Sequence, residues 1–180
     1  GVERYEPCPE AVVLQEIRAA RAQGARLLCL GGPGYPALLA EIADAPPVLW
    51  VKGDPALLAR PVVGLVGARN ASSLGGRMAR RLAESLGEAG FVIASGLARG
   101  IDAEAHRASL PTGTVAVVAG GLDVVYPPEH AGLAAEIAEK GCLLSEQPFG
   151  LEPQARHFPQ RNRIVSGLSR ALVVVEAAAR

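Results

Sequence analysis

Two segments of this 180-residue sequence hold the residue types best suited to chemistry. The first, residues 95–102 (SGLARGID), follows an apolar run and contains Gly96, Arg99 and Gly100. The second, residues 158–163 (FPQRNR), sets two arginines and an amide beside an aromatic ring. Glycine turns expose backbone N–H groups to phosphate, arginine forks bind phosphate, and aromatic rings stack on bases. The pattern predicts a nucleotide or a nucleic-acid strand bound where the segments meet, although Arg99 can equally face solvent.

A third segment, residues 67–76 (GARNASSLGG), also follows an apolar run. Its Arg69 offers a fork for phosphate. Ser72 and Ser73 can donate to phosphate or cap the helix that follows, and both interpretations stay open. The segment has neither the G-x-G-x-x-G spacing of dinucleotide sites nor the Gly-Lys-Ser/Thr of a P-loop.

Three acids and a tyrosine are candidates to support the site. Asp102 can cap the helix that it opens, or form a pair with His106 one turn later. Asp123 can orient a sugar or buttress its loop, and Tyr126 can stack on a base or wall the pocket. Glu146 can accept a hydrogen bond from an arginine. The three acids also form a conceivable acid/base set, but no nucleophile accompanies them, so catalysis is not favoured.

The FPQRNR segment carries its own alternatives. Phe158 precedes a proline and is predicted to be displayed in a loop. Arg161 and Arg163 cannot both face the core, because an unpaired buried charge is costly. At least one of them can instead join an Arg–Glu network that knits loops together. Asn162 can cap a short helix.

The composition favours a layered α/β protein. The apolar fraction is 49% but aromatics are only 4%, so the core must consist mostly of Val, Leu, Ile and Ala. A net charge of zero argues against indiscriminate coating of nucleic acid. The charge is nevertheless uneven: residues 69–107 hold six arginines and four acids, and residues 151–170 hold four arginines and one acid. A local basic groove on a neutral body is therefore expected.

Cysteines, histidines and apolar runs give no sign of metal or membrane. Cys8, Cys29 and Cys142 are isolated, and the last two lie in apolar runs, which predicts core positions. The three histidines lack ligand spacing, so neither a metal nor a cofactor is expected. No apolar run reaches about 18 residues, and the first residues do not form a signal sequence. A cytoplasmic protein is predicted.

Continuous apolar runs alternate with helical periodicity along most of the chain. This alternation predicts a mostly parallel sheet with helices on both faces. The three glycine and arginine segments each follow a strand, so they should meet at the carboxyl edge of that sheet. The predicted strands are 26–31, 48–51, 62–66, 91–94, 115–119, 142–145 and 171–175. The predicted helices are 10–23, 36–42, 77–88, 103–108, 133–139 and 162–168.

Seven motifs in order resemble the DNA-processing protein A family of bacteria, also called Smf or DprA. The resemblance runs from about residue 35 to residue 176. The motifs are YPALL (35–39), LWVKG (49–53), GAR (67–69), SGLARGID (95–102), GLD (121–123), SEQP (145–148) and FPQRNRIVSGLS (158–169). Each is weak alone, but the order and spacing are specific.

The resemblance implies an extended Rossmann-like domain that binds single-stranded DNA and is not an enzyme. Members of the family act in natural transformation, where they protect incoming strands and help to load the RecA recombinase, typically as dimers. Carried over, the DNA contacts are Arg69, Ser72, Phe158, Arg161 and Arg163, with Gly96, Gly100 and Gly120 on the pocket floor. The alternatives are a nucleotide sensor and a nucleoside-monophosphate phosphoribohydrolase on a related fold, although the Pro-Gly-Gly-x-Gly-Thr stretch of the latter is missing.

The sequence departs from the family pattern in a few places. Ala68 stands where Ser is frequent, and Leu74 stands where Tyr is usual. Family members also continue beyond the last predicted strand, where the dimer and RecA surfaces largely lie. The N-terminal part is too short for a complete helical accessory domain, so residues 1–34 are predicted to be a helical remnant of one or a connector. Residues 35–180 are predicted to be a Rossmann-like domain, incomplete at its C-terminus.

Overall fold

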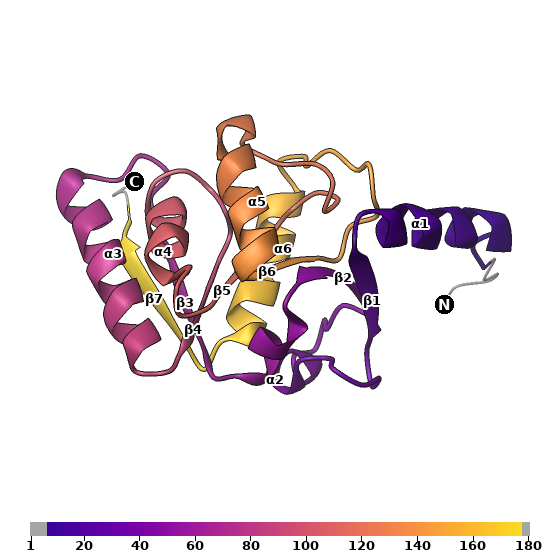
Figure 1. Cartoon of the computed structure of the whole chain (residues 1–180), viewed down its shortest axis with the longest axis horizontal. Coiled ribbons are helices and arrows are strands. Elements are labelled where there is room, and N and C mark those ends of the chain that lie inside the picture. Colours follow the sequence, from indigo (N-terminus) through magenta and orange to yellow (C-terminus); the bar gives the residue numbers. More distant parts are fainter. Residues whose placement is uncertain (1–6, 178–180) are drawn as a thin grey trace.

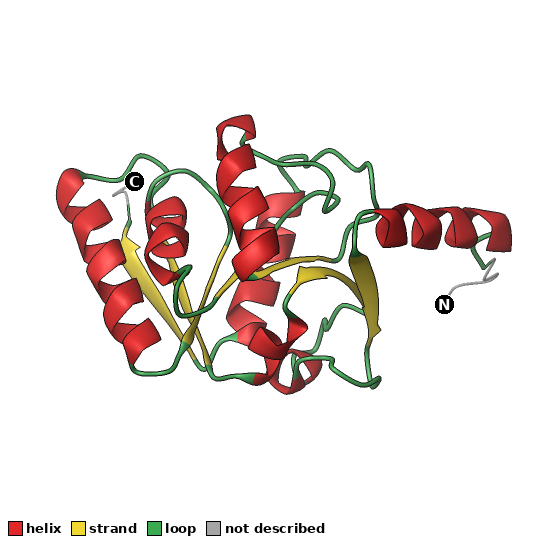
Figure 2. Cartoon of the chain, in the orientation of Figure 1, coloured by secondary structure: helices red, strands yellow, loops and turns green. Residues whose placement is uncertain are grey.

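The computed structural model describes residues 7–177, and its centre is a seven-stranded sheet in the order β1-β2-β6-β5-β4-β3-β7. The strands are β1 (Ala25–Cys29), β2 (Val48–Gly53), β3 (Val62–Gly67), β4 (Val92–Ser95), β5 (Thr114–Val117), β6 (Cys142–Ser145) and β7 (Ala171–Glu176). Strands β6, β5, β4, β3 and β7 run parallel, whereas β2 and β1 join the β6 edge in antiparallel pairing. The predicted α/β class with a mostly parallel sheet is confirmed (Figure 2).

Helices cover both faces of this sheet. They are α1 (Glu10–Ala22), α2 (Ala37–Ala40), α3 (Ser73–Glu88), α4 (Ile101–Ser109), α5 (Ala131–Lys140) and α6 (His157–Leu168), with short 3-10 turns η1 (Pro55–Ala59) and η2 (Pro128–His130). The connections through α3, α4 and α5 step from β3 to β6 in one direction, and α6 carries the chain back to β7 beside β3. Because such crossovers are right-handed, α3, α4 and α5 lie on one face and α6 on the other (Figure 1).

The core explains why the strands are so uniformly apolar. On the α6 face, Ile164 and Leu168 pack against strand residues such as Val115 and Leu144. On the face of α3 and α4, a separate cluster contains Ile93 of β4. Strands buried on both faces cannot alternate polar and apolar residues, so they form short continuous apolar runs.

The N-terminal part adds an edge to the sheet. Strand β1 pairs with β2 along its whole length, and Leu28 of β1 joins the core. Trp50 of β2 donates from Nε1 to Glu16 of α1 at 3.0 Å. The predicted boundary near residue 34 stays a prediction. Residues 1–6 of the predicted N-terminal segment, and residues 178–180 of the predicted domain, lie outside the described residues.

Several sequence expectations need correction. Helix α6 begins at His157, so Phe158 and Arg161 lie on its first turns and not in a loop. Arg156 is the N-cap of α6, without a side-chain cap, so Asn162 does not cap it. Proline is compatible with the first turn of a helix, where its missing N–H would have no partner, so Pro159 does not delay α6. Cys29 is exposed rather than buried, whereas Cys142 is buried as expected. No helix in the part of the chain that the structure covers is long and apolar enough to span a bilayer.

Candidate nucleic-acid interface

A pocket of about 190 Å³ opens at the carboxyl ends of β3 and β4. It lies beside the point where the strand order reverses, because β4 and β7 flank β3 and are reached through helices on opposite faces of the sheet. Ligands of open α/β sheets bind at such points. Its lining comprises Val66, Gly67, Arg69, Gly96, Ala98, Asp102, Phe158, Arg161, Asn162, Val165 and Leu172.

Arg161 forms the floor of this pocket. The residue is only 5% exposed, and its Nη1 donates to the backbone carbonyl oxygens of Gly96 and Val117. Its Nε donates to Oδ1 of Asn162 at 3.2 Å. A Cβ on Gly96 would lie 2.1 Å from Nη1 of Arg161, so only glycine leaves room for the guanidinium. Gly96 of the SGLARGID motif therefore leaves the space that Arg161 of the FPQRNR motif occupies.

Asp102 lies next to this arginine, inside α4 rather than at its cap. Its carboxylate accepts from the backbone N–H groups of Gly96 at 3.1 Å and Ala98 at 3.3 Å, and so it shapes the loop before the helix. Burial raises the pKa of Asp102, and the nearby Arg161 opposes the shift. Burial likewise lowers the pKa of Arg161, and Asp102 opposes that shift. The expected cap and the expected pair with His106 are both wrong.

His106 instead lies one turn further along α4 and is fully buried. Its Nδ1 is 2.7 Å from Oγ1 of Thr114 on β5. Burial, together with the positive charge of Arg161, lowers the pKa of His106 to about 3. The ring is therefore neutral near pH 7 and acts as a core residue.

Gly100 brings two of the strand-end loops together. It has a φ of +72°, and a Cβ there would lie 2.2 Å from the carbonyl oxygen of Ala68. The N–H of Ile101 donates to that same oxygen at 3.2 Å. Only glycine tolerates both the backbone conformation and the close approach. Arg69 follows directly after this contact, so Gly100 fixes the loop that presents it.

The rim of the pocket combines an arginine with two aromatic rings. The Arg69 Cζ lies over the Phe158 ring, 4.9 Å from its centroid. The Tyr126 ring packs against Phe158 at a centroid distance of 5.6 Å and a tilt of 50°. Tyr126 is 46% exposed, so this ring has free surface for stacking. Arg69, Phe158 and Tyr126 are called the rim trio below.

Two other predicted arginines are held by carboxylates. Arg99 pairs with Glu129, and this hydrogen bond raises the pKa of Arg99. Arg163 pairs with Glu146 and lies 3.3 Å from the Asp44 carboxylate. The Arg–Glu network expected for one arginine of the motif is thus formed by Arg163. Its Nη1 has no hydrogen-bond partner among residues 7–177.

The loop after β5 stands apart from the pocket floor. A Cβ on Gly120 would lie 2.7 Å from the carbonyl oxygen of Leu151, so this glycine makes room for a neighbouring loop. Asp123 accepts from the N–H of Gly150 at 2.8 Å. The structure favours the buttressing interpretation for Asp123 and does not bring Gly120 into the pocket lining.

Ser72 acts as the N-cap of α3. Its Oγ accepts from the N–H of Gly75 at 3.0 Å and donates to the carboxylate of Glu176 at 2.7 Å. The N–H of Ser72 donates to the same carboxylate at 3.0 Å. Glu176 and Asp44 are site residues that the sequence did not reveal. One feature of the sequence could have indicated Glu176: it follows directly after the last predicted strand. In the structure that strand, β7, pairs with β3, which brings Glu176 to the start of α3.

Residues 7–177 contain no group of three His, Cys, Asp or Glu side chains arranged to hold an ion. The pocket combines two guanidinium groups and an aromatic ring with one buried carboxylate, Asp102, and this set suits an anionic ligand with flat rings.

A parallel sheet with a glycine-lined, arginine-floored pocket at its carboxyl edge defines a Rossmann-like α/β domain. Residues 26–180 match the family model described as DNA recombination-mediator protein A. The chain belongs to this family of DNA-processing proteins, also called DprA or Smf.

Curated relatives and solved structures agree with this assignment. The chain is 46% identical over 153 residues to Protein Smf of Synechocystis, covering 81% of this chain and 38% of the relative. It is 42% identical over 163 residues to DNA processing protein DprA of Bacillus subtilis, covering 89% of this chain and 55% of the relative. The chain therefore spans about half the length, or less, of these relatives.

Two solved structures share the fold. DNA processing protein A of Streptococcus pneumoniae matches with a TM-score of 0.87 and 38% identity, covering 96% of this chain and 60% of that chain. The Helicobacter pylori protein, whose structure concerns its single-stranded DNA binding mode, matches with a TM-score of 0.80 and 30% identity, covering 87% of this chain and 71% of that chain.

Proposed function

We propose that this domain binds single-stranded DNA across the carboxyl edge of its sheet. The observation that carries the proposal is the buried Arg161 guanidinium beneath the rim trio, in which Arg69 and Tyr126 are exposed and Phe158 is half-buried. A preorganised cation below a flat aromatic surface fits a phosphate linked to an unpaired base. The single-stranded DNA binding mode of the H. pylori relative supports the same ligand class here.

Each pocket residue has a role in this proposal. Arg69 contacts a phosphate at the rim, because its guanidinium is exposed and oriented by the Phe158 ring. Tyr126 stacks on a base, which contributes about 1–3 kcal/mol with little sequence preference. Arg161 attracts the phosphate from below while it holds the ends of two strands together. Arg99 and Arg163 are assigned to their carboxylate partners and not to DNA.

The size of the pocket favours a strand over a free nucleotide. Its volume of about 190 Å³ is below the roughly 300–1,000 Å³ of typical small-molecule sites. A phosphate with part of its sugar fits this space, while the rest of a strand continues over the rim. A nucleotide sensor is the less favoured alternative for that reason.

The acids at the sheet edge support a binding protein rather than an enzyme. Asp102 accepts two backbone N–H bonds, and Asp123 accepts a third in another loop. Glu146 is paired with Arg163. A phosphoribohydrolase would need a carboxylate free to act on its substrate, so this alternative is not favoured.

The cellular role follows from the family and is part of the proposal. We propose that the whole protein protects single strands that enter the cytoplasm during natural transformation and assists RecA loading on them. We further propose that it does so as a homodimer. The family description as a recombination mediator supports this role.

The proposal is tested by titrating a fluorescent oligo-dT with the protein and measuring anisotropy. Arg69→Gln should weaken binding about 10- to 100-fold, as expected for a charge-assisted contact of about 1.5–3 kcal/mol. The salt dependence should also fall by about 0.7 in log–log slope, for one phosphate fewer. Arg18→Gln, which removes one exposed charge from α1, is the matched control and should bind normally.

Competition decides between ligand classes in the same assay. Unlabelled single strand should compete far better than duplex of equal length or AMP. Competition by AMP alone would favour a nucleotide sensor, and normal binding by Arg69→Gln would refute the pocket assignment.

A further inference from the structure

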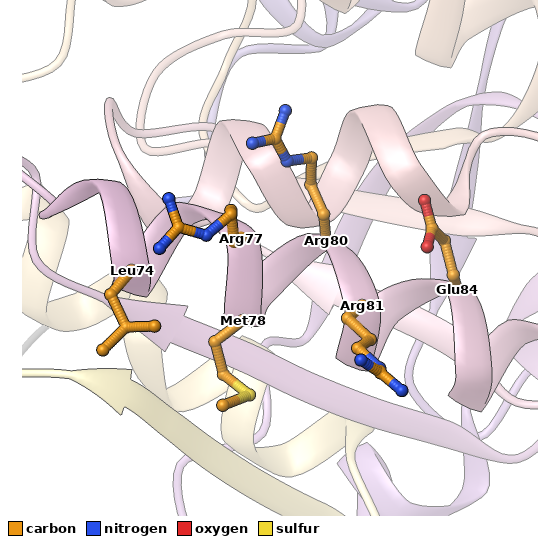
Figure 3. A pocket seen from close by; sticks show the side chains of 6 residues that line it. All are labelled: Leu74, Arg77, Met78, Arg80, Arg81 and Glu84. Carbon is orange, nitrogen blue, oxygen red and sulfur yellow. The ribbon is translucent and has the colours of Figure 1, made fainter.

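The outer face of α3 is basic over two helical turns. Three arginines, Arg77, Arg80 and Arg81, lie within five residues, and all three are exposed. With Leu74, Met78 and Glu84 they line a shallow groove of about 680 Å³ (Figure 3). These six residues are called the α3 groove below. The pocket at the sheet edge shares none of them.

The charge of this face is positive even after its ion pairs are counted. Arg80 lies 3.3 Å from Glu104, which also pairs with Arg107 at 3.2 Å. One carboxylate thus serves two guanidinium groups. Glu84 is the single acid in the α3 groove, against three arginines. Such an excess of arginine on a protein of zero net charge indicates a local site for an anionic polymer.

The α3 groove also carries two unusually exposed apolar side chains. Leu74 is 63% exposed and Met78 is 47% exposed. They lie one helical turn apart and point to the same side as Arg81, whereas Arg77 and Arg80 point to the other side (Figure 3). Apolar side chains with Arg81 beyond them on the same side and Arg77 beside them match a strand that lays its bases on the helix and turns its phosphates to the two arginines.

Exposed residues connect the α3 groove to the rim of the pocket. Arg69 belongs to the lining of the pocket, and Leu74 belongs to the lining of the groove. Between them Asn70 and Ser73 are exposed, and Ser72, also exposed, holds the Glu176 carboxylate. The segment that joins β3 to α3 therefore leads from one site to the other along the surface.

We propose that the α3 groove is a second contact for single-stranded DNA, used by a strand that leaves the pocket over Arg69. This inference rests on the proposed function and extends it to the length of DNA bound. It assigns phosphate contacts to Arg77 and Arg81 and base contacts to Leu74 and Met78. A strand too short to pass Arg69 does not reach the groove.

The test compares two lengths of oligo-dT, of about 6 and about 30 nucleotides, with the parent chain and three variants. Arg77→Gln/Arg81→Gln should bind the short strand like the parent and the long strand about tenfold more weakly. Its salt slope on the long strand should fall by about 1.4, for two phosphate contacts. Arg18→Gln/Arg21→Gln removes the same charge from α1, at the opposite end of the molecule (Figure 1), and should bind both strands like the parent.

The third variant separates this inference from the proposed function. Arg69→Gln should lose affinity for both lengths. If Arg77→Gln/Arg81→Gln binds both lengths like the parent, the inference is overturned and the α3 groove is left to an acidic protein partner. If the α1 control loses long-strand affinity equally, the effect is one of net charge and the inference is also overturned. If the parent binds neither strand, both proposals fail.

Discussion

The pocket over β3 and β4 and the neighbouring cluster over β6 are built from the same residue types at the same sheet edge, but they differ in charge balance. The pocket is lined by two arginines, Arg69 and Arg161, and by one carboxylate, Asp102. In the cluster, Asp44 and Glu146 both face one guanidinium, that of Arg163. Arg161 and Arg163 are two residues apart on α6, so the helix turn alone sends them to opposite environments.

This difference shows that the type of a side chain does not decide its role. An arginine surrounded by two acids is already neutralised and contributes to the structure. An arginine that shares one buried acid with another arginine keeps positive potential for an anion. The number of carboxylates within reach therefore separates the proposed binding region from the structural region, and three measurements can challenge that separation.

The largest effect should come from the glycine beneath Arg161. In Gly96→Ala, a Cβ would fall 2.1 Å from the guanidinium, which must leave its two carbonyl partners and move into the pocket. We expect oligo-dT binding to weaken about 100-fold, or about 2.7 kcal/mol. Gly132→Ala on α5, where a Cβ meets nothing within 4 Å, is the control and should bind normally. Normal binding by Gly96→Ala would remove Arg161 from the binding region.

The second effect is on the pH dependence of the free energy of unfolding, and it comes from the buried His106. Its pKa is about 3 in the folded protein, lowered by burial and by the charge of Arg161, against about 6.5 when unfolded. Below pH 6.5 the unfolded chain binds a proton that the folded chain does not, so stability falls as pH falls. The loss is about 2 kcal/mol between pH 7.5 and pH 5.

Urea unfolding at pH 7.5 and pH 5 measures this loss. His106→Asn should be less stable than the parent at pH 7.5, because it leaves a void, but should lack this part of the pH dependence. The difference in pH dependence between the parent and His106→Asn gives the contribution of His106 alone, because the other titrating groups are the same in both proteins. An equal pH dependence in both proteins would contradict the assigned pKa.

The smallest effect should come from the structural region. Arg163→Gln leaves Glu146, whose side chain is 16% exposed, without its cation. We expect the free energy of unfolding to fall by about 1–2 kcal/mol, below the full effect of a buried pair because the side chains are partly exposed. Oligo-dT affinity should stay within about twofold of the parent. Asp44→Asn, at a side chain that is 67% exposed, should cost less. A loss of affinity with unchanged stability would reverse the comparison.

The parallel part of the fold was predictable because its strands are buried on both faces. The strands predicted at 62–66, 142–145 and 171–175 lie within one residue of β3, β6 and β7. Helix starts were less predictable, since α3 begins four residues before the predicted start at residue 77 and α6 includes Phe158. The residues around a helix start are polar both in the preceding loop and in the first turn, so the sequence does not show where one ends and the other begins.

The candidate site was predictable only in part. Glycine and arginine segments at strand ends predicted that Arg69, Gly96 and Arg161 meet, because parallel strands share one edge. Which arginine would be neutralised depended on Asp44, far along the chain in a segment before β2. The sequence carries no periodic signal for that contact, so Arg163 was grouped with the binding residues.

The Glu176 carboxylate at the start of α3 has a further consequence for selectivity. A helix N-terminus after the first strand of such a sheet is where Rossmann enzymes hold the pyrophosphate of a free dinucleotide. Here the chain carries its own anion at that position, bound to Ser72. A soluble dinucleotide would compete there with the Glu176 carboxylate, which belongs to the same chain and so has an effective concentration of about millimolar or higher. The Glu176 carboxylate thus disfavours a dinucleotide at this helix N-terminus, in keeping with the proposed polymeric ligand, which binds at several points at once.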